Sequence, residues 1–204
     1  MIEIAENGLQ TAVLLICAGW ALLRVLAFES RTWTMLLLFY AGWILGDIYW
    51  LVYLLFFGRT PVFSVVSDLS WYAAIMFLYL LLRHTSPPHR PRERRLLPFL
   101  GPVFTLGMAA FFMQWGEYGN NLIYACLMGL LLFTALRILS ETPAGGKRSL
   151  AAVTLVYCLL EYALWTASCF ADNPPMNLIY YGLDVLLTGC MVFFLPAVKR
   201  TVTA

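Results

Sequence analysis

Charged residues are scarce in this sequence, and their scarcity defines its class. Only 12% of its 204 residues are charged, whereas a soluble domain carries roughly 25%. Hydrophobic residues make up 62% of the chain, and the mean hydropathy is +0.79. A water-soluble globule of this size could not bury so much apolar surface. The composition therefore excludes a soluble enzyme, a nucleic-acid-binding domain and a disordered chain.

The sequence also lacks the cysteine and histidine patterns of a disulfide framework or a zinc site. Its five cysteines lie in or beside apolar runs and form no CxxC pair, so neither kind of site is indicated. The two histidines, His84 and His89, have no cysteine or carboxylate neighbour at metal-ligand spacing. We expect no metal site, no cofactor and no nucleic-acid partner.

Long apolar runs are what the sequence has instead. A helix needs about 20 mostly apolar residues to cross the hydrocarbon of a bilayer, and these runs are too long and continuous for barrel strands. Glu3 and Glu6 stand where a signal peptide would be basic, which favours a retained first helix. We predict one all-α membrane domain over 1–204 with seven transmembrane helices, at 8–28, 32–57, 61–82, 96–115, 121–139, 150–171 and 176–198.

The basic residues predict an orientation. If the N-terminus lies outside, twelve of the thirteen Lys and Arg residues fall on the inner side and only Arg59 falls outside. Lys and Arg are enriched in cytoplasmic loops, so we expect the N-terminus out and the C-terminus in. The longest connection, 84–95, is basic and broken by prolines; we expect a solvated inner loop. These features fit a multi-pass protein of a bacterial inner (cytoplasmic) membrane, with the lipid bilayer as its first partner.

Two triplets of predicted helices repeat each other. Segments 21–30 and 134–143 share an apolar run, an arginine, an aliphatic pair and a glutamate. Four charged landmarks follow at intervals of 23, 21 and 15 residues in the first triplet and 24, 23 and 15 in the second. With one connecting helix between them, the triplets form a 3+1+3 parallel repeat: repeat 1 at 8–83, the connector at 96–115 and repeat 2 at 121–200. The landmarks are Arg24, Asp47, Asp68 and Arg83, and then Arg137, Glu161, Asp184 and Lys199.

Four of these landmarks are carboxylates inside predicted membrane helices. Each costs about 2.5 kcal/mol or more at the bilayer centre. Helical rise places Asp47 and Glu161 roughly 15 Å deep, and Asp68 and Asp184 roughly 10–12 Å deep, all in the outer half and with no basic residue at that depth. We expect them to converge in a wet pocket that opens outward. The alternative is structural: protonated acids that hydrogen-bond between helices, aided by Ser64, Ser67, Ser70, Thr154 and Thr188.

Aromatic side chains crowd the same level. An outer aromatic belt is the ordinary explanation, but Trp43, Trp50 and Trp165 sit deeper than such a belt, and Trp71 follows Asp68 closely. Acidic and aromatic walls suit a cationic ligand. The predicted ligand-binding residues are Asp47, Asp68, Glu161, Asp184, Trp43, Trp50, Trp71 and Trp165.

Small residues predict where helices pack closely. Gly42 and Gly46 form a small-xxx-small pair just before Asp47, and Gly182 and Gly189 lie on the last span. Such residues let helix backbones approach each other in membranes. Pro98, Pro102 and Pro196 are expected at helix ends or kinks. We therefore expect close helix approach at both glycine pairs.

The second and third spans resemble a known module. Trp43, Gly46, Asp47, Trp50, Tyr53, Gly58, Pro61, Ser64, Ser67, Asp68, Trp71 and Tyr72 follow in order and are succeeded by LLLR at 80–83. This pattern resembles the seven-helix membrane sensor module that precedes bacterial diguanylate cyclase and histidine kinase domains. The resemblance implies sensing from the outer side. Because the sequence ends at Ala204, we expect a separate signalling partner on the inner side.

Two further resemblances imply an enzyme. Membrane-bound terpenoid cyclases of the fungal meroterpenoid type have seven helices with an acid on an early helix and another on the last, which Asp47 and Asp184 match, with Glu161 less directly placed. The Gly-Asp and Ser-Asp pairs are similar to those of lysoplasmalogenase-like proteins. For such an enzyme the catalytic candidates are Asp47, Glu161 and Asp184, with a protonated acid as proton donor.

Three functions follow from these observations. The first is a receptor- or sensor-like protein that binds a small cationic or amphiphilic ligand. The second is an intramembrane acid-catalysed enzyme, and the third is a proton-coupled transporter that uses the same acids as proton carriers. An outward-open pocket closed below favours binding, a sealed chamber favours catalysis, and passage on both sides favours transport.

Overall fold

The computed structural model describes residues 2–61, 64–86 and 96–203, and within these ranges it is helical with no strand. The backbone divides into two compact units, unit 1 (Met1–Leu78) and unit 2 (Tyr79–Ala204), with the boundary inside one helix. The predicted basic loop at 84–95 falls outside the described residues from 87 onward. Each unit is considered by itself.

Seven helical segments in the described residues are long and apolar enough to cross a membrane. The prediction of seven spans is therefore confirmed, and the chain is a multi-pass membrane protein. The segments are Ile2–Phe28, Arg31–Phe57, Val65–Thr85, Leu97–Trp115, Tyr118–Glu141, Gly146–Ser168 and Pro174–Val202.

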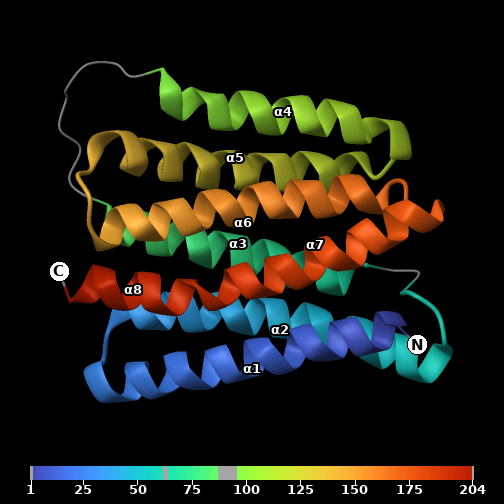
Figure 1. Cartoon of the computed structure of the whole chain (residues 1–204), viewed down its shortest axis with the longest axis horizontal. Coiled ribbons are helices and arrows are strands. Elements are labelled where there is room, and N and C mark those ends of the chain that lie inside the picture. Colours follow the sequence, from blue (N-terminus) through green and yellow to red (C-terminus); the bar gives the residue numbers. More distant parts are fainter. Residues whose placement is uncertain (1, 62–63, 87–95, 204) are drawn as a thin grey trace. The chain divides into compact units, whose positions relative to one another are not determined.

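Unit 1 begins with a helical hairpin. Helices α1 (Ile2–Phe28) and α2 (Arg31–Phe57) pack against each other, as Figure 1 shows in blue. Glu29 turns the chain with a positive φ of 47°. Helix α2 ends at Gly58, whose φ of 64° places it in the left-handed region and whose N–H caps the carbonyl of Leu54, a frequent helix-ending conformation that glycine adopts without strain.

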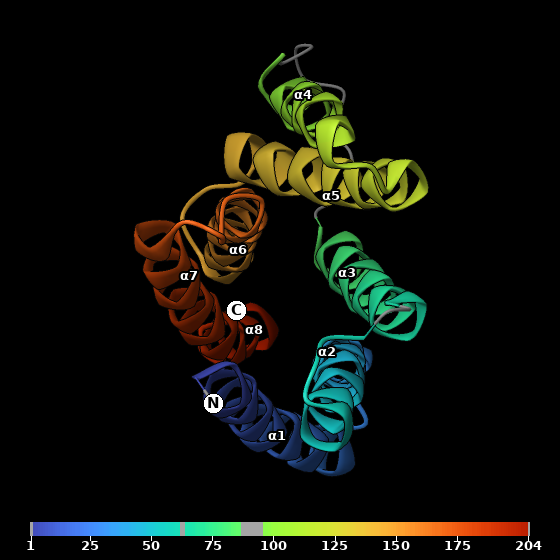
Figure 2. The same ribbon diagram turned by 90° about the vertical axis from the view of Figure 1, so that its right-hand side faces the viewer.

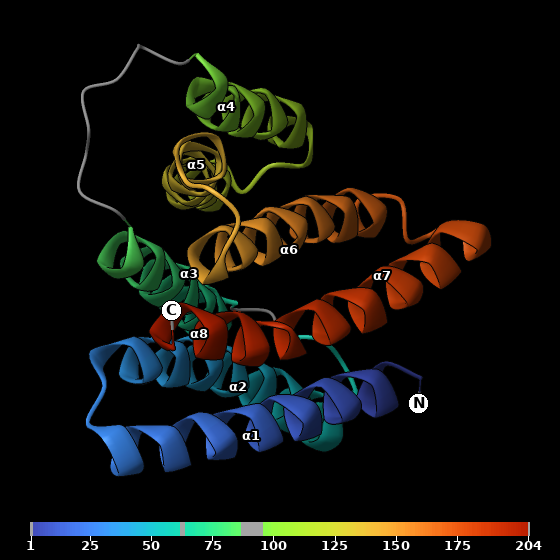
Figure 3. The same cartoon turned by 60° about the vertical axis from the view of Figure 1, so that its left-hand side comes forward.

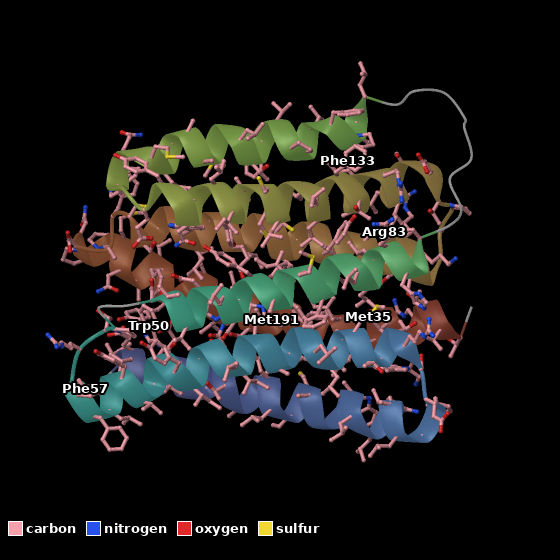
Figure 4. The ribbon with its side chains drawn as sticks, turned by 180° about the vertical axis from the view of Figure 1, so that it is seen from behind. Met35, Trp50, Phe57, Arg83, Phe133 and Met191 are labelled. Atoms are coloured by element: carbon pink, nitrogen blue, oxygen red, sulfur yellow. The ribbon has the colours of Figure 1, made fainter. Side chains whose placement is uncertain are left out.

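Helix α3 (Val65–Thr85) meets α2 through glycine. A Cβ added to Gly42 would lie 2.9 Å from the backbone oxygen of Ser70 and 3.0 Å from the Cβ of Ala74, and one added to Gly46 would overlap the Trp71 indole. The predicted close approach at this small-xxx-small pair is confirmed. Figure 4 shows α2 from its beginning, near Met35, to Trp50 and its last residue, Phe57.

Unit 2 holds the remaining helices, which pack in chain order. The 3-10 turn η1 (Leu97–Phe99) leads into α4 (Leu100–Phe112) and η2 (Met113–Trp115). Helix α4 lies along α5 (Tyr118–Glu141), as Figures 1 and 2 both show. A Cβ on Gly101 would lie 2.9 Å from the backbone nitrogen of Phe133, so a glycine again sets the separation of the helices.

The last predicted span is two helices in the structure. Helix α6 (Gly146–Ser168) packs against α7 (Pro174–Val192) and α8 (Phe194–Val202). Figure 3 shows α8 following α7 after a short break. The break has a cause in Pro196, which has no backbone N–H and whose ring would clash with the carbonyl of Val192 in a continuous helix. Phe193 donates instead to the Cys190 carbonyl, at 3.0 Å.

The expected packing at the second glycine pair and the predicted starts of the first and third helices need correction. A Cβ on Gly182 or Gly189 would meet nothing within 4 Å, so no helix approaches closely at either glycine. The first helix begins at Ile2, earlier than predicted, and carries Glu3 in its first turn, where a negative charge favours the helix dipole. The third helix begins at Val65, four residues after Pro61.

Candidate functional site

In unit 1 the structure gathers three of the predicted tryptophans. The rings of Trp43 and Trp71 lie 5.7 Å apart between centroids, and those of Trp50 and Trp71 lie 6.0 Å apart. Trp71 thus contacts both Trp43 and Trp50, which lie seven positions apart on one face of α2. We call Trp43, Trp50 and Trp71 the tryptophan cluster.

The predicted acids of unit 1 lie on α2 and α3. Asp47, on α2, is almost fully buried, with 2% of its surface exposed. Asp68, on α3, is half-buried, and its Oδ2 accepts a hydrogen bond of 2.6 Å from the Ser64 hydroxyl. This serine partner is local, one turn before Asp68, and not the bond between helices that the structural alternative predicts.

Unit 1 also contains an acid at the cluster that the sequence analysis did not assign to the site. The indole N–H of Trp50 donates to Oε1 of Glu3, at 3.5 Å. The two residues are far apart in sequence and meet because α1 and α2 run antiparallel as a hairpin. From the sequence, Glu3 argues only against a signal peptide.

In unit 2 the centre of the site is Glu161 on α6. Its side chain is 7% exposed, and Oε2 accepts a hydrogen bond of 3.0 Å from the hydroxyl of Tyr124 on α5. The other oxygen, Oε1, is buried and has no hydrogen-bond partner among the described residues. A buried polar atom without a partner typically lowers stability by about 1–3 kcal/mol. A donor or a cation that reached this oxygen would therefore be bound favourably.

Further polar groups surround this carboxylate. Asp184 on α7, itself 7% exposed, interacts electrostatically with Glu161, and the hydroxyl of Tyr157 on α6 also interacts with this carboxylate. Tyr157 lies one turn before Glu161 on the same helix. The structure thus brings together the two predicted acids of repeat 2 within a single unit.

Aromatic rings from three helices form one wall beside Glu161. Trp165 lies 4.5 Å from Tyr124 and 5.0 Å from Phe112 between ring centroids, and the second pair is stacked at 15°. Tyr162 joins them through edge contacts with Phe104, at 5.1 Å, and Tyr124, at 5.7 Å. We call these five residues, Phe104, Phe112, Tyr124, Tyr162 and Trp165, the aromatic cluster.

The eight predicted ligand-binding residues therefore divide between the units. Unit 1 holds the tryptophan cluster with Asp47 and Asp68, and unit 2 holds Glu161, Asp184 and Trp165. The meeting of all four acids in one pocket stays a prediction. Sequence reasoning missed Tyr124, Phe104 and Phe112. Only their aromatic character marked them, and it did not set them apart from lipid-facing residues.

Comparison of the chain with known protein families, with curated protein sequences and with solved structures finds no match. Function is therefore inferred from the site itself.

The arrangement in unit 2 has three chemical capacities. A buried carboxylate attracts a cation, and aromatic faces add cation–π attraction. The Glu161–Asp184 pair can also hold and pass a proton, a role that acids inside membrane helices commonly serve. The Tyr124 hydroxyl fixes one carboxylate oxygen and leaves the other for the incoming group.

Proposed function

We propose that this protein is a receptor- or sensor-like membrane protein that binds a small cationic or amphiphilic ligand at Glu161. The observation that carries the proposal is the buried Oε1 of Glu161, which has no hydrogen-bond partner among the described residues. Asp184 adds a second negative group, and Trp165 and Tyr124 supply aromatic faces at one side. A cation that enters gains from both kinds of contact.

The distribution of charge supports a direction of entry. The excess of Lys and Arg on one side of the spans favours the N-terminus outside and the C-terminus inside, so that Glu161 and Asp184 lie in the outer half of the bilayer of a bacterial inner membrane. The matched charged landmarks support the 3+1+3 parallel repeat. By its resemblance to sensor modules, the protein passes its signal to a separate partner on the inner side.

Equilibrium binding of a lipophilic cation tests the ligand site. The probe is tetraphenylphosphonium, which combines a positive charge with aromatic rings, and the sample is the purified full chain in a neutral detergent. We expect saturable binding that weakens roughly 30-fold or more in Glu161→Gln, because the substitution removes the charge from a buried pair while keeping its volume. Trp165→Leu should weaken binding by a smaller factor, since it removes only the aromatic face.

Glu141→Gln is the matched control, because Glu141 is an exposed acid at the end of α5 in the same unit. It should bind the probe as the wild type does, and thermal unfolding of each variant shows whether it is folded. Equal affinity in the wild type, Glu161→Gln and Glu141→Gln would contradict the proposal.

A proton-coupled transporter is the second candidate, and the pairing of Glu161 with Asp184 inside unit 2 favours it. Two carboxylates that interact electrostatically titrate as a coupled pair. Proteoliposomes with an imposed pH gradient distinguish the two functions: a receptor binds the cation in proportion to the protein present, whereas a transporter accumulates it far beyond that amount, dependent on Glu161.

A further inference from the structure

A second feature of unit 2 lies away from the acids, on the opposite faces of α6 and α7. These helices leave a groove of about 540 Å³ between them. Its lining includes Val156 and Leu160 from α6 and Leu186, Gly189, Cys190 and Phe193 from α7 and its end. The Cys190 thiol is directed to the Val153 carbonyl, at 3.8 Å, so the groove presents almost only hydrocarbon.

The equivalent positions of repeat 1 bring two helices into close contact. Gly42 and Gly46 precede Asp47 by five and one residues, as Val156 and Leu160 precede Glu161. In repeat 1 the backbones of α2 and α3 meet at these glycines. In repeat 2 the branched side chains of Val156 and Leu160 line the groove instead, whereas small residues let helix backbones meet.

The partner helices show the same contrast. Ser70 and Ala74 follow Asp68 by two and six residues, as Leu186 and Cys190 follow Asp184. Ser70 and Ala74 touch Gly42 in repeat 1, whereas Leu186 and Cys190 line the groove in repeat 2. The correspondence between these positions rests on the proposed repeat, whereas the groove between α6 and α7 is present whether or not the helices are duplicated.

Basic residues stand at one end of the groove. Arg148 lies on the same face of α6 as Ala152, Val156 and Leu160, at successive steps of four. A Cβ on Gly146 would overlap the Arg200 backbone, so the start of α6 and the end of α8 are adjacent. Four basic residues therefore gather there: Lys147, Arg148, Lys199 and Arg200.

We propose that this groove holds an acyl chain of an anionic phospholipid whose phosphate lies against those four basic residues. An apolar groove on membrane-spanning helices is bathed in hydrocarbon chains, and the cationic end selects a negative headgroup, as basic pockets between membrane helices do. Arg148 also donates to the carbonyls of Leu139 and Thr142 at the end of α5, at 2.8 and 3.1 Å, which holds its guanidinium beside the start of α6. The site is separate from Glu161 and does not depend on its ligand.

Native mass spectrometry of the full chain in a neutral detergent tests this site. The probes are dioleoyl phosphatidylglycerol, which is anionic, and dioleoyl phosphatidylcholine, which is zwitterionic with the same chains. We expect a saturable adduct with phosphatidylglycerol at lipid concentrations where phosphatidylcholine gives none. Lys199→Gln combined with Arg200→Gln should weaken that adduct roughly 30-fold, while Arg59→Gln, at an exposed arginine of unit 1, should not.

Gly189→Leu tests the groove without touching the charges. A Cβ at Gly189 meets nothing within 4 Å, so leucine fits there and fills the groove that this residue lines. Gly182→Leu is the matched control, because Gly182 is exposed on the same helix, also has open space and does not line the groove. We expect Gly189→Leu to lose the phosphatidylglycerol adduct and Gly182→Leu to keep it.

Three results would overturn the lipid site. Equal binding of the two lipids would show that the basic residues do not select the headgroup. An unchanged adduct in Gly189→Leu would show that the acyl chain does not lie in the groove. A wild-type dimer that Gly189→Leu separates into monomers, with no lipid adduct in either, assigns the groove to a second copy of the chain.

Discussion

A carboxylate buried in a membrane-spanning helix is rare because its cost is high, and Glu161 shows how a protein can keep one. Its Oε2 is fixed by the Tyr124 hydroxyl at 3.0 Å, while the buried Oε1 has no hydrogen-bond partner among the described residues. The rings of the aromatic cluster form a wall on one side of Glu161. The residue is therefore held in place without being neutralised by a salt bridge within the described part of unit 2.

Removing the hydroxyl of Tyr124 tests this arrangement. Tyr124→Phe leaves Oε2 of Glu161 without its donor, and we expect a loss of about 1–3 kcal/mol in the free energy of unfolding. Tyr118→Phe is the control, since Tyr118 begins the same helix and is 65% exposed. Reversible unfolding of the full chain in mixed detergent measures both. Equal stabilities for the two variants would mean that the hydrogen bond contributes nothing.

The site could be predicted only in part at this scale. Glu161, Asp184 and Trp165 stood out because acids and deep tryptophans are costly or unusual inside a predicted membrane helix. Tyr124 did not, because its contact with Glu161 spans 37 residues and depends on which faces of α5 and α6 meet. A membrane helix is apolar on every side, so it has no polar stripe that would show which face meets its neighbour.

At the scale of helices, glycine decides how closely neighbours pack. Gly42 and Gly46 join α2 to α3, and Gly101 lies against the α5 backbone in unit 2. The small-xxx-small spacing predicted the first contact. It did not predict the second contact. The expectation that Gly182 and Gly189 pack closely, which rested on their small size, was wrong, because residue size alone does not say which face of a helix has a neighbour.

Gly42→Ala tests the contact of α2 with α3. The new Cβ would lie 2.9 Å from the Ser70 backbone oxygen, which cannot move aside as a flexible side chain can. Overpacking of this kind costs about 1–3 kcal/mol, and we expect that loss in the free energy of unfolding. The measurement is reversible denaturation of the full chain.

Gly19→Ala is the control for that experiment, since Gly19 lies exposed on α1 of the same unit with nothing within 4 Å of an added Cβ. Alanine there should be neutral or stabilising by up to about 1 kcal/mol, because it favours a helix over glycine. If Gly42→Ala behaves like Gly19→Ala, α2 and α3 do not pack at this glycine.

At the scale of the whole molecule, seven spans could be predicted because the length of an apolar run is set by the thickness of the bilayer. The helix ends were less predictable. Pro196 divides the last span into α7 and α8. The first helix begins at Ile2 and so includes the polar residues before the predicted start at position 8. Helix ends depend on caps and local hydrogen bonds, which hydropathy does not register.

The proposed 3+1+3 repeat relates two helix pairs that differ in the size of the residues between them. Helix α2 packs tightly against α3 at small residues, and α6 and α7 leave a groove lined by larger ones. The acids, which stand at matched intervals in the two triplets, are the element on which the proposed ligand site rests.

The central claim is that a cationic ligand meets the carboxyl group of Glu161, and infrared difference spectroscopy of the full chain in lipid tests it most directly. Adding tetraphenylphosphonium should perturb a carboxyl stretching band in the wild type and in Glu141→Gln, and this band should be missing in Glu161→Gln. The same band in all three proteins, or probe binding with no carboxyl change in the wild type, would contradict the claim.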